Sequence, residues 1–416
     1  MKRKNIFIAL SYALLLLVSC TGKEFKEVTI LETTDLHGVL WPYDYIEGRK
    51  TEASLASVAT YVNTLRSANE TVFLLDNGDN IQGQPSVYYY NYIDTLAPHI
   101  ISEAFNYLDY DAGTVGNHDI EAGHSVYDRL VDEYDFPLLA ANAVSTSTGE
   151  PYFKPYHIIK KNGVRIAILG LVTPAIPTWL PEELYKGMEF RDMTETAQKW
   201  MPVIQNEKPD IIVGLFHSGW DRSRAQAGDA NMDENGSVSV AFNVPGFDVI
   251  FNGHDHRVAN ELFVNRAGDT VLILNGGSRS QNVARADVRI GSSRNSGKKV
   301  KKISGSIINV ADYEPDSMYL ETFRAKHETV IAYVNRVIGT SSVSISSRDA
   351  YFGSSAFVDL LHSIQIEITG ADVSFAAPLS FDVSIEKGDI TVGDMFKLYR
   401  FENMLYTMEL SGEEIK

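Results

Sequence analysis

Short apolar runs rich in β-branched residues alternate with helical stretches along most of the chain. Two of these runs, at 166–169 and 211–213, lack the polar alternation of a strand with one exposed face. Continuous apolar runs are typical of strands that are covered on both faces. The pattern therefore predicts an α/β fold in which helices cover a sheet. The predicted strands are 28–31, 72–75, 164–172, 211–216, 249–251 and 271–274.

The chain beyond these strands predicts a hairpin, a helix and a second unit. The hairpin spans 285–310, and we interpret the lysines near its polar tip as a solvated turn. Apolar residues at helical spacing predict one helix over 315–337 that connects two domains. Another unit starts after Gly339, and because a further helix is indicated just before Lys416, we expect this unit to be incomplete. The hairpin lysines are Lys298, Lys299, Lys301 and Lys302.

Composition and charge narrow the possible partners. The chain has 416 residues, of which 44% are hydrophobic and 22% charged, as in ordinary globular proteins. Its 37 lysines and arginines stand against 54 aspartates and glutamates, which gives a net charge of −17. Because this charge repels polyanions, we do not expect a nucleic-acid polymer as a partner. The single cysteine excludes an internal disulfide and a cysteine-type zinc site, so any metal needs His, Asp, Glu or Asn ligands.

The first twenty residues have the pattern of an export signal. Three basic residues precede an apolar run at 6–18, which is too short to span a bilayer. The run leads into Cys20 with the sequence LVSC, which resembles the lipobox of bacterial lipoproteins. The alternative is an incidental or buried cysteine. We therefore expect a signal peptide at 1–20 and a mature protein attached to the membrane only through lipidated Cys20. It would belong to the bacterial cell envelope and face the periplasm or the cell surface.

Polar side chains suited to metal binding follow five apolar runs. Open α/β sheets bind ligands at the carboxyl ends of their strands, so these side chains are expected to converge. Taken singly, an Asp-x-His sequence is usually a capped turn, and a strand-end histidine is usually a satisfied polar group. Five such positions in order, each at a strand end, instead favour a shared metal site. The candidates are Asp35 and His37, Asp79, Asn117 and His118, His217, and His254 and His256.

These five blocks resemble the calcineurin-like metallophosphoesterases, specifically the bacterial 5'-nucleotidase and 2',3'-cyclic-nucleotide 2'-phosphodiesterase (3'-nucleotidase) family. The resemblance covers nearly the whole mature chain. It implies a layered β-sandwich flanked by helices at 24–312, a linker helix at 313–340 and a truncated α/β 5'-nucleotidase-type substrate domain at 341–416. It also implies two divalent metal ions. One would be held by Asp35, His37 and His256 and the other by Asn117, His217 and His254, with Asp79 bridging them.

The implied ligand set is consistent with phosphoester hydrolysis. Two divalent cations carry four positive charges and only two of the ligands are anionic, so about +2 remains to attract a phosphate and a hydroxide. A hydroxide that bridges the metals could attack phosphorus without a protein nucleophile. The mixed His, Asp and Asn donors suit zinc, manganese or iron.

His118 is the candidate general acid, because it adjoins a predicted ligand without being one and could protonate the leaving oxygen. Glu121 lies three residues further on, within one helical turn, and takes the place of the family's dyad partner, which is aspartate in many relatives. Asp119 is the rival partner and is expected to point away. His124 is expected to cap a helix or to pack.

The second unit resembles the start of the family's substrate domain. Phe401 and Asn403 match a motif in which an aromatic ring stacks on the base and an asparagine reaches it. The alternative is that Phe401 is a core residue. The arginines that 5'-nucleotidases usually carry in an earlier loop are absent from 375–380, which favours the cyclic phosphodiesterase branch.

The sequence therefore predicts an exported two-metal phosphoesterase that hydrolyses 2',3'-cyclic nucleotides and 3'-nucleotides. A 5'-nucleotidase or nucleotide-sugar hydrolase with the same metal site is the first alternative. The second is a non-catalytic ligand-binding lipoprotein, which the complete ligand set together with His118 disfavours.

Overall fold

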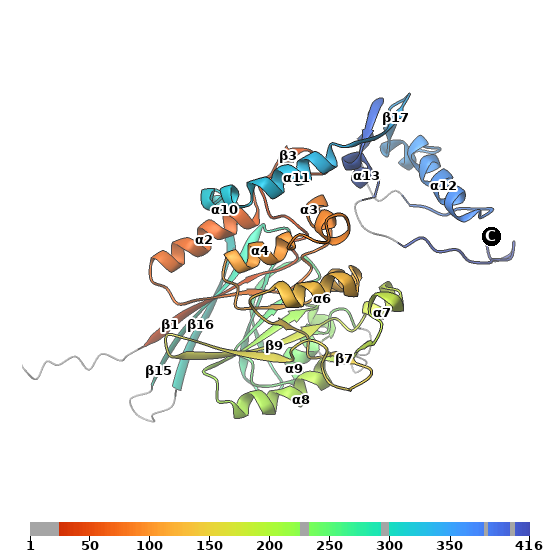
Figure 1. Ribbon diagram of the computed structural model, residues 1–416. Coiled ribbons are helices and arrows are strands. Elements are labelled where there is room, and N and C mark those ends of the chain that lie inside the picture. The colour runs from red at the N-terminus through yellow and green to blue at the C-terminus, as the bar shows by residue number, and fades with distance from the viewer. Residues whose placement is uncertain (1–24, 225–232, 293–298, 378–381, 400–403) are drawn as a thin grey trace, which may run out of the picture.

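The computed structural model describes residues 25–224, 233–292, 299–377, 382–399 and 404–416. Its larger unit contains two six-stranded sheets with helices on their outer sides (Figure 1). The predicted signal peptide with Cys20 and the predicted substrate residues Phe401 and Asn403 lie outside the described residues.

Both sheets combine four neighbouring parallel strands with two antiparallel strands. In spatial order the first sheet contains β16 (Lys299–Asn309), β15 (Asn282–Ser292), β1 (Lys26–Thr33), β4 (Val72–Asp76), β5 (Ala112–Thr114) and β6 (Leu138–Leu139). The second contains β13 (Val258–Val264), β14 (Thr270–Gly276), β12 (Val249–Asn252), β11 (Ile211–His217), β9 (Val164–Val172) and β8 (Tyr156–Lys161). All six strands predicted from apolar runs are present.

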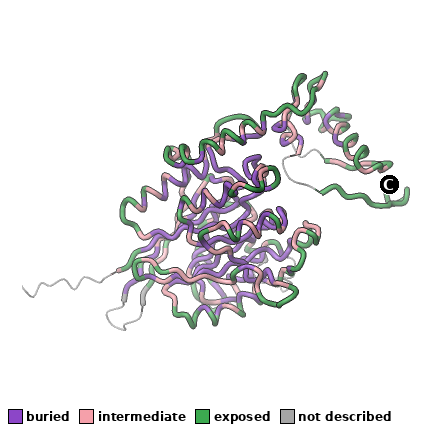
Figure 2. Tube along the Cα trace, in the orientation of Figure 1, coloured by how far each residue is buried: buried purple, intermediate pink, exposed green. Residues whose placement is uncertain are grey.

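The strands are buried on both faces, because successive side chains point to opposite sides of a sheet. In β1, Ile30 lies in the core between the two sheets, whereas Leu31 lies in the core beneath the outer helices. In β4, Phe73 likewise lies in the core between the sheets and Leu74 in the core beneath the outer helices. Figure 2 shows the result, with buried chain in the centre and exposed chain mainly on the outer helices. This two-sided burial accounts for the apolar runs without polar alternation.

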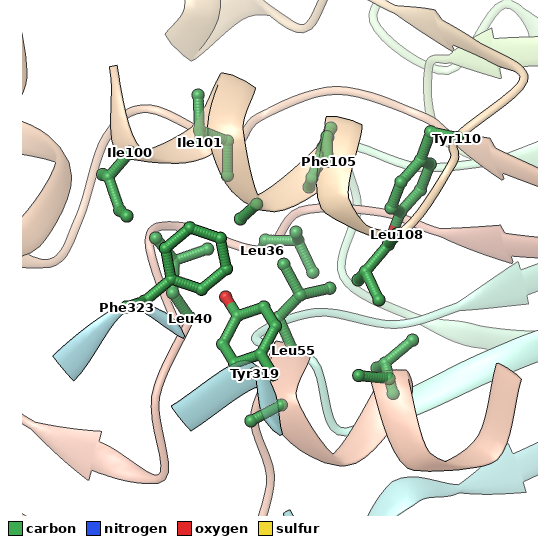
Figure 3. Packing of buried hydrophobic residues seen from close by; sticks show 14 of the residues in the cluster. Leu36, Leu40, Leu55, Ile100, Ile101, Phe105, Leu108, Tyr110, Tyr319 and Phe323 are labelled. Carbon is green, nitrogen blue, oxygen red and sulfur yellow. The ribbon is translucent and has the colours of Figure 1, made fainter. Parts of the chain in front are cut away.

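Helices cover the outer face of each sheet and complete four layers. On the first sheet, Leu55, Phe105 and Tyr319 come from three different helices and meet in one apolar cluster (Figure 3). The helices of this layer are α2 (Leu55–Ser67), α4 (Ile100–Tyr107), α10 (Ser317–Thr322) and α11 (Arg324–Val334). On the second sheet the layer consists of α8 (Met193–Asn206) and α9 (Ser237–Asn243). The predicted α/β sandwich flanked by helices is confirmed.

The prediction of a single helix over 315–337 is wrong in detail. The chain forms α10 and α11 instead, and they meet at Phe323, whose backbone leaves helical geometry at φ −99° and ψ 9°. Phe323 is buried in the cluster of the first sheet, so packing fixes the break. Val337 is exposed and starts a strand, β17 (Val337–Ser341).

The interpretation of the hairpin lysines as a solvated turn is also corrected. Lys301 and Lys302 lie within β16, paired with β15, rather than at the tip. Lys301 forms an ion pair with Asp248, with 2.6 Å between Nζ and Oδ2. The tip itself, at 293–298, lies outside the described residues.

The second unit is small and contacts the first through a few apolar side chains. It contains α12 (Ala356–Thr369), α13 (Val392–Leu398) and two short strand pairs. Phe396 of α13 packs with Ile46 of the first unit, and its ring lies 5.2 Å from that of Tyr88. Within the described ranges, no helix combines the length and apolarity needed to cross a bilayer.

Candidate metal centre

The predicted ligands lie at the carboxyl ends of parallel strands of both sheets: His217 ends β11, Asn117 begins α5 (Asn117–Glu121), and the other five lie in the connecting loops. These strands are β1, β4, β5, β11 and β12, so the carboxyl ends of the two sheets present their side chains at one place. Five of the seven have a positive φ, which is uncommon for residues other than glycine and typical of functional sites. They are Asp35 (51°), His37 (49°), Asp79 (58°), His254 (74°) and His256 (57°).

Asp35, His37 and His256 form the first cluster. Nε2 of His37 lies 3.1 Å from Nε2 of His256, which lies 3.3 Å from Oδ1 of Asp35. Nδ1 of His37 donates to the carbonyl oxygen of Gln82 at 3.0 Å, so its Nε2 lone pair faces the cluster. Burial lowers the pKa of His37 to about 4, which keeps this ring neutral and able to act as a ligand.

Asp79, His217 and His254 form the second cluster, and Asn117 lies between the two rings. Oδ1 of Asn117 is 2.8 Å from Nδ1 of His254 and 3.2 Å from Nε2 of His217. Nδ1 of His217 donates to the carbonyl oxygen of Asn77 at 2.6 Å, which fixes the ring. The structure thus brings together all four residues that the sequence predicts for this side.

The side chain of Asp79 contacts His217 of its own cluster and the backbone of His118. Its Oδ2 lies 3.1 Å from Nε2 of His217, and its Oδ1 accepts from the backbone N–H of His118. Burial alone would raise the pKa of Asp79, but His217, His118 and His37 together hold it well below its usual range. Burial alone would lower the pKa of His217. The negative charge of Asp79 outweighs this effect and raises the pKa of His217 to about 10.

The donor atoms fit divalent metal ions. Within each of the two groups of His and Asp residues, the candidate donor atoms all lie within 4.8 Å of one another. Imidazole nitrogen and carboxylate oxygen are ligands of zinc, manganese and iron alike, so the donor set does not distinguish among these metals.

His118 lies beside the clusters and pairs with Glu121. Both belong to α5 (Asn117–Glu121), and 2.6 Å separate Nδ1 of His118 from Oε2 of Glu121. Burial opposes the charged form of His118, but Asp79 and the hydrogen bond to Glu121 raise its pKa to about 9. Since the ring of His118 lies 5.6 Å from that of His37, its side chain borders the first cluster.

Asp119 and His124, which the sequence analysis considered beside the His118–Glu121 pair, have other hydrogen-bond partners. Asp119 accepts hydrogen bonds from the backbone N–H groups of Gly116, Asp79 and Asn80, and so holds two ligand loops together. Nδ1 of His124 lies 3.1 Å from Asp128, and its Nε2 donates to a carbonyl oxygen at 2.9 Å.

Sequence reasoning missed three residues around the clusters. The side chain of Asn77 donates to the carbonyl oxygen of Phe216 at 3.0 Å and lies 3.4 Å from Glu32. Glu32 is fully buried, and burial raises its pKa well above the usual range. The ring of Trp179 stacks on that of His254. Asn77 stands in the block DNGDN and Glu32 is a charged residue in an apolar strand, so both carried a usable signal, whereas nothing in the sequence marks Trp179.

Two family models match the chain. The calcineurin-like phosphoesterase model matches residues 28–258, and the model of the 5'-nucleotidase C-terminal domain matches 337–416.

Proteins with related sequences carry names from nucleotide chemistry. The chain is 28% identical over 435 residues to the trifunctional nucleotide phosphoesterase protein YfkN of Bacillus subtilis; the match covers 94% of this chain but 29% of that protein. It is 26% identical over 466 residues to a 2',3'-cyclic-nucleotide 2'-phosphodiesterase/3'-nucleotidase of Yersinia enterocolitica, and here the match covers 100% of this chain and 71% of the relative.

Solved structures share the fold. A calcineurin-like phosphoesterase structure of YfkN from Bacillus subtilis matches with a TM-score of 0.65 and 28% identity over 75% of this chain and 100% of that one. A putative 5'-nucleotidase from Staphylococcus aureus matches with a TM-score of 0.76 over 90% of this chain and 72% of that one, and at 20% identity this likeness concerns the fold alone.

Proposed function

Because the chain belongs to the calcineurin-like phosphoesterase family, we propose that it is a two-metal hydrolase of 2',3'-cyclic nucleotides and 3'-nucleotides. The observation that carries the proposal is the convergence of two clusters of metal-binding side chains next to a histidine that belongs to neither. The relative from Yersinia enterocolitica is named for these two activities, which supports the choice of substrate. The absence of arginine from 375–380 supports it as well.

In this proposal each predicted ligand has one role. Asp35, His37 and His256 would hold one divalent cation, Asn117, His217 and His254 would hold the second, and Asp79 would serve both. When bound, the cations would offset the negative charge of the phosphoester and lower the pKa of a nearby water. Hydrogen bonds from Nδ1 of His37 and of His217 to carbonyl oxygens orient the two rings for this task.

His118 would protonate the oxygen that leaves the phosphorus atom. Glu121 accepts from Nδ1 of His118, so Nε2 is the nitrogen that would carry the transferred proton. The carboxylate also stabilises the protonated ring, which a general acid requires before the bond breaks. The backbone N–H of His118 donates to Asp79, so the acid and the bridging ligand hold a fixed relative position.

We further propose that the mature chain starts at Cys20, is anchored there by lipid and works outside the cytoplasm. The basic residues, the apolar run and the LVSC sequence support this. Metabolic labelling with a fatty acid, compared between the natural chain and Cys20→Ala, would test it. Equal labelling of both chains would contradict it.

The proposed activity is tested by hydrolysis of 2',3'-cyclic AMP by residues 21–416, with 5'-AMP as the comparison substrate. We expect chelation to abolish release of 3'-AMP and adenosine, and added manganese or zinc to restore it. Turnover of 5'-AMP with none of the cyclic ester would overturn the substrate assignment. Hydrolysis that resists chelation would overturn the metal mechanism.

Asp79→Asn tests the bridging role within the same assay. The substitution removes the charge shared by both clusters, so we expect loss of bound metal together with a fall in kcat of roughly 100-fold or more. Asp349→Asn, at an exposed position of the second unit, is the matched control. An Asp79→Asn protein with two metals per chain and full turnover would exclude the bridge.

A further inference from the structure

Trp179 is an exposed aromatic residue next to a predicted ligand. Its ring stacks on the ring of His254, with 5.4 Å between the ring centroids and 29° between the planes. Although Trp179 contacts His254, 41% of its surface remains exposed. Tryptophan usually buries most of its surface, so an open indole beside the reaction site calls for a functional explanation.

The segment that carries Trp179 is held on its N-terminal side. The backbone N–H of Thr173 donates to the carbonyl oxygen of His217 at 2.9 Å, and the side chain of Ile176 is buried in an apolar cluster. Trp179 itself ends the short helix α7 (Ile176–Trp179), which has proline in its first turn. A rigid backbone lowers the entropy lost when the ring contacts a ligand.

The position of α7 favours a contact with substrate. Figure 1 shows α7 on the same side of the first unit as α12 and the C-terminal segment of the second unit. His254, on which the ring stacks, belongs to one of the two clusters that would hold the phosphoester. The indole therefore borders one of the two clusters that would hold the phosphoester.

We propose that Trp179 contacts the nucleoside part of the substrate and makes the enzyme prefer nucleoside phosphates to phosphates of small aliphatic alcohols. The inference rests on the proposed function, because it takes the two clusters as the place where phosphorus is held. Every nucleobase has a π face, and stacking on an aromatic side chain changes affinity by roughly fivefold to 150-fold. An indole carries no charge for the phosphate, so the contact selects the base or sugar.

A purely structural role would give a different result. If Trp179 only held the ring of His254 in place, its removal would weaken metal binding and reduce turnover of every substrate alike. A substrate contact instead changes affinity for the nucleoside and leaves the metal content unchanged.

The deciding experiment titrates adenosine, which has base and ribose but no phosphorus, into the metal-loaded mature protein by calorimetry. We expect Trp179→Ala to weaken adenosine binding about tenfold or more, and Trp179→Phe, which keeps a stacking ring, to restore most of it. Metal content measured on the same samples should be equal. Trp200→Ala is the control, because Trp200 lies on α8 and packs with Tyr156 rather than with a predicted ligand.

Kinetics on two cyclic esters provide a second readout. We expect Trp179→Ala to raise KM for 2',3'-cyclic AMP about tenfold with little change in kcat. For glycerol 1,2-cyclic phosphate, which has the same cyclic ester without a base, kcat/KM should change less than about twofold.

Adenosine affinity that Trp179→Ala leaves unchanged would overturn the inference, and so would equal losses on the two esters. If the natural chain hydrolyses neither ester, the proposed function fails instead. The adenosine titration then still decides whether Trp179 forms a nucleoside site.

Discussion

Each loop of the candidate site depends on a neighbouring loop for its conformation. The backbone N–H of Asp35 donates to the carbonyl oxygen of Gly78, and that of His37 donates to Asp79. These bonds hold positive-φ backbone that costs roughly 1–2 kcal/mol at each residue other than glycine. Because the loops stabilise one another, a substitution in one of them should also disturb the ligands carried by the next.

Replacement of His118 by alanine should separate proton transfer from metal binding. We expect both metals to remain, because the side chain of His118 is in neither cluster. The rate should fall by roughly 100-fold to 10,000-fold for esters with poorly leaving alcohols, and far less for aryl esters that leave without a proton. The measurement is kcat across a series of leaving groups together with metal content. A uniform loss across the series would contradict the general-acid role.

Asn77 should act through His217. Its carbonyl oxygen accepts from Nδ1 of His217, and its side chain ties this turn to the end of β11 through Phe216. Since residues that orient a metal-binding histidine typically contribute 10-fold to 100-fold in affinity, we expect Asn77→Ala to weaken metal binding by about tenfold. Asn260→Ala is a suitable control, because Asn260 bonds a carbonyl oxygen of β16 remote from the clusters. Unchanged metal affinity in Asn77→Ala would show that the turn holds without its side chain.

The candidate ligands could be predicted from the sequence because each follows a recognisable strand and has a chemically distinctive side chain. The contacts that support these ligands could not be predicted in this way. Glu32 interrupts an apolar strand and points toward Asn77, a neighbour 45 positions away. Trp179 meets His254 only because β9 and β12 lie in one sheet. Local patterns hold no information on such pairs, which depend on how distant segments pack.

At the scale of elements, the turn after β4 and the start of α5 approach too closely for a side chain between them. A Cβ atom on Gly116 would overlap the Asp79 carboxylate and come within 2.5 Å of its backbone nitrogen. We therefore expect Gly116→Ala to displace Asp79, with lost metal binding and a destabilisation of about 1–3 kcal/mol. Thermal unfolding and metal titration measure these effects.

The matched control is Gly339→Ala, because a Cβ atom there meets nothing within 4 Å. It should retain full metal binding and stability. If Gly116→Ala behaves like this control, the two loops are more adaptable than their hydrogen bonds indicate.

The connector between the units shows where sequence periodicity reaches its limit. Apolar positions at helical spacing run without interruption from Leu320 to Val334, yet the chain breaks at Phe323. The cause is tertiary, because Tyr319 and Phe323 both pack against Tyr107 of α4. A periodic pattern indicates which residues are buried, but it does not indicate whether a single straight helix can bury all of them.

At the scale of the whole molecule, the chain forms two units that share little apolar contact. The first unit carries every described candidate ligand, and its four layers bury separate apolar clusters between the sheets and beneath the helices on each side. The second unit meets it through Phe396, Val392 and Ile46. Chemistry should therefore survive changes at this contact, whereas delivery of a nucleotide should not.

Phe396→Ala tests this division of labour. The substitution removes a buried ring that packs on Ile46 and Tyr88, and truncation of a buried phenylalanine typically costs about 3–5 kcal/mol. We expect faster proteolytic cleavage between the units and a raised KM for 2',3'-cyclic AMP, with metal content and turnover of a small aryl phosphate unchanged. Phe352→Ala is the control in the same unit, because that ring is exposed. If Phe396→Ala impairs the aryl phosphate as strongly as the nucleotide, the second unit supports the metal centre itself, and its contact with the first unit is part of the catalytic fold.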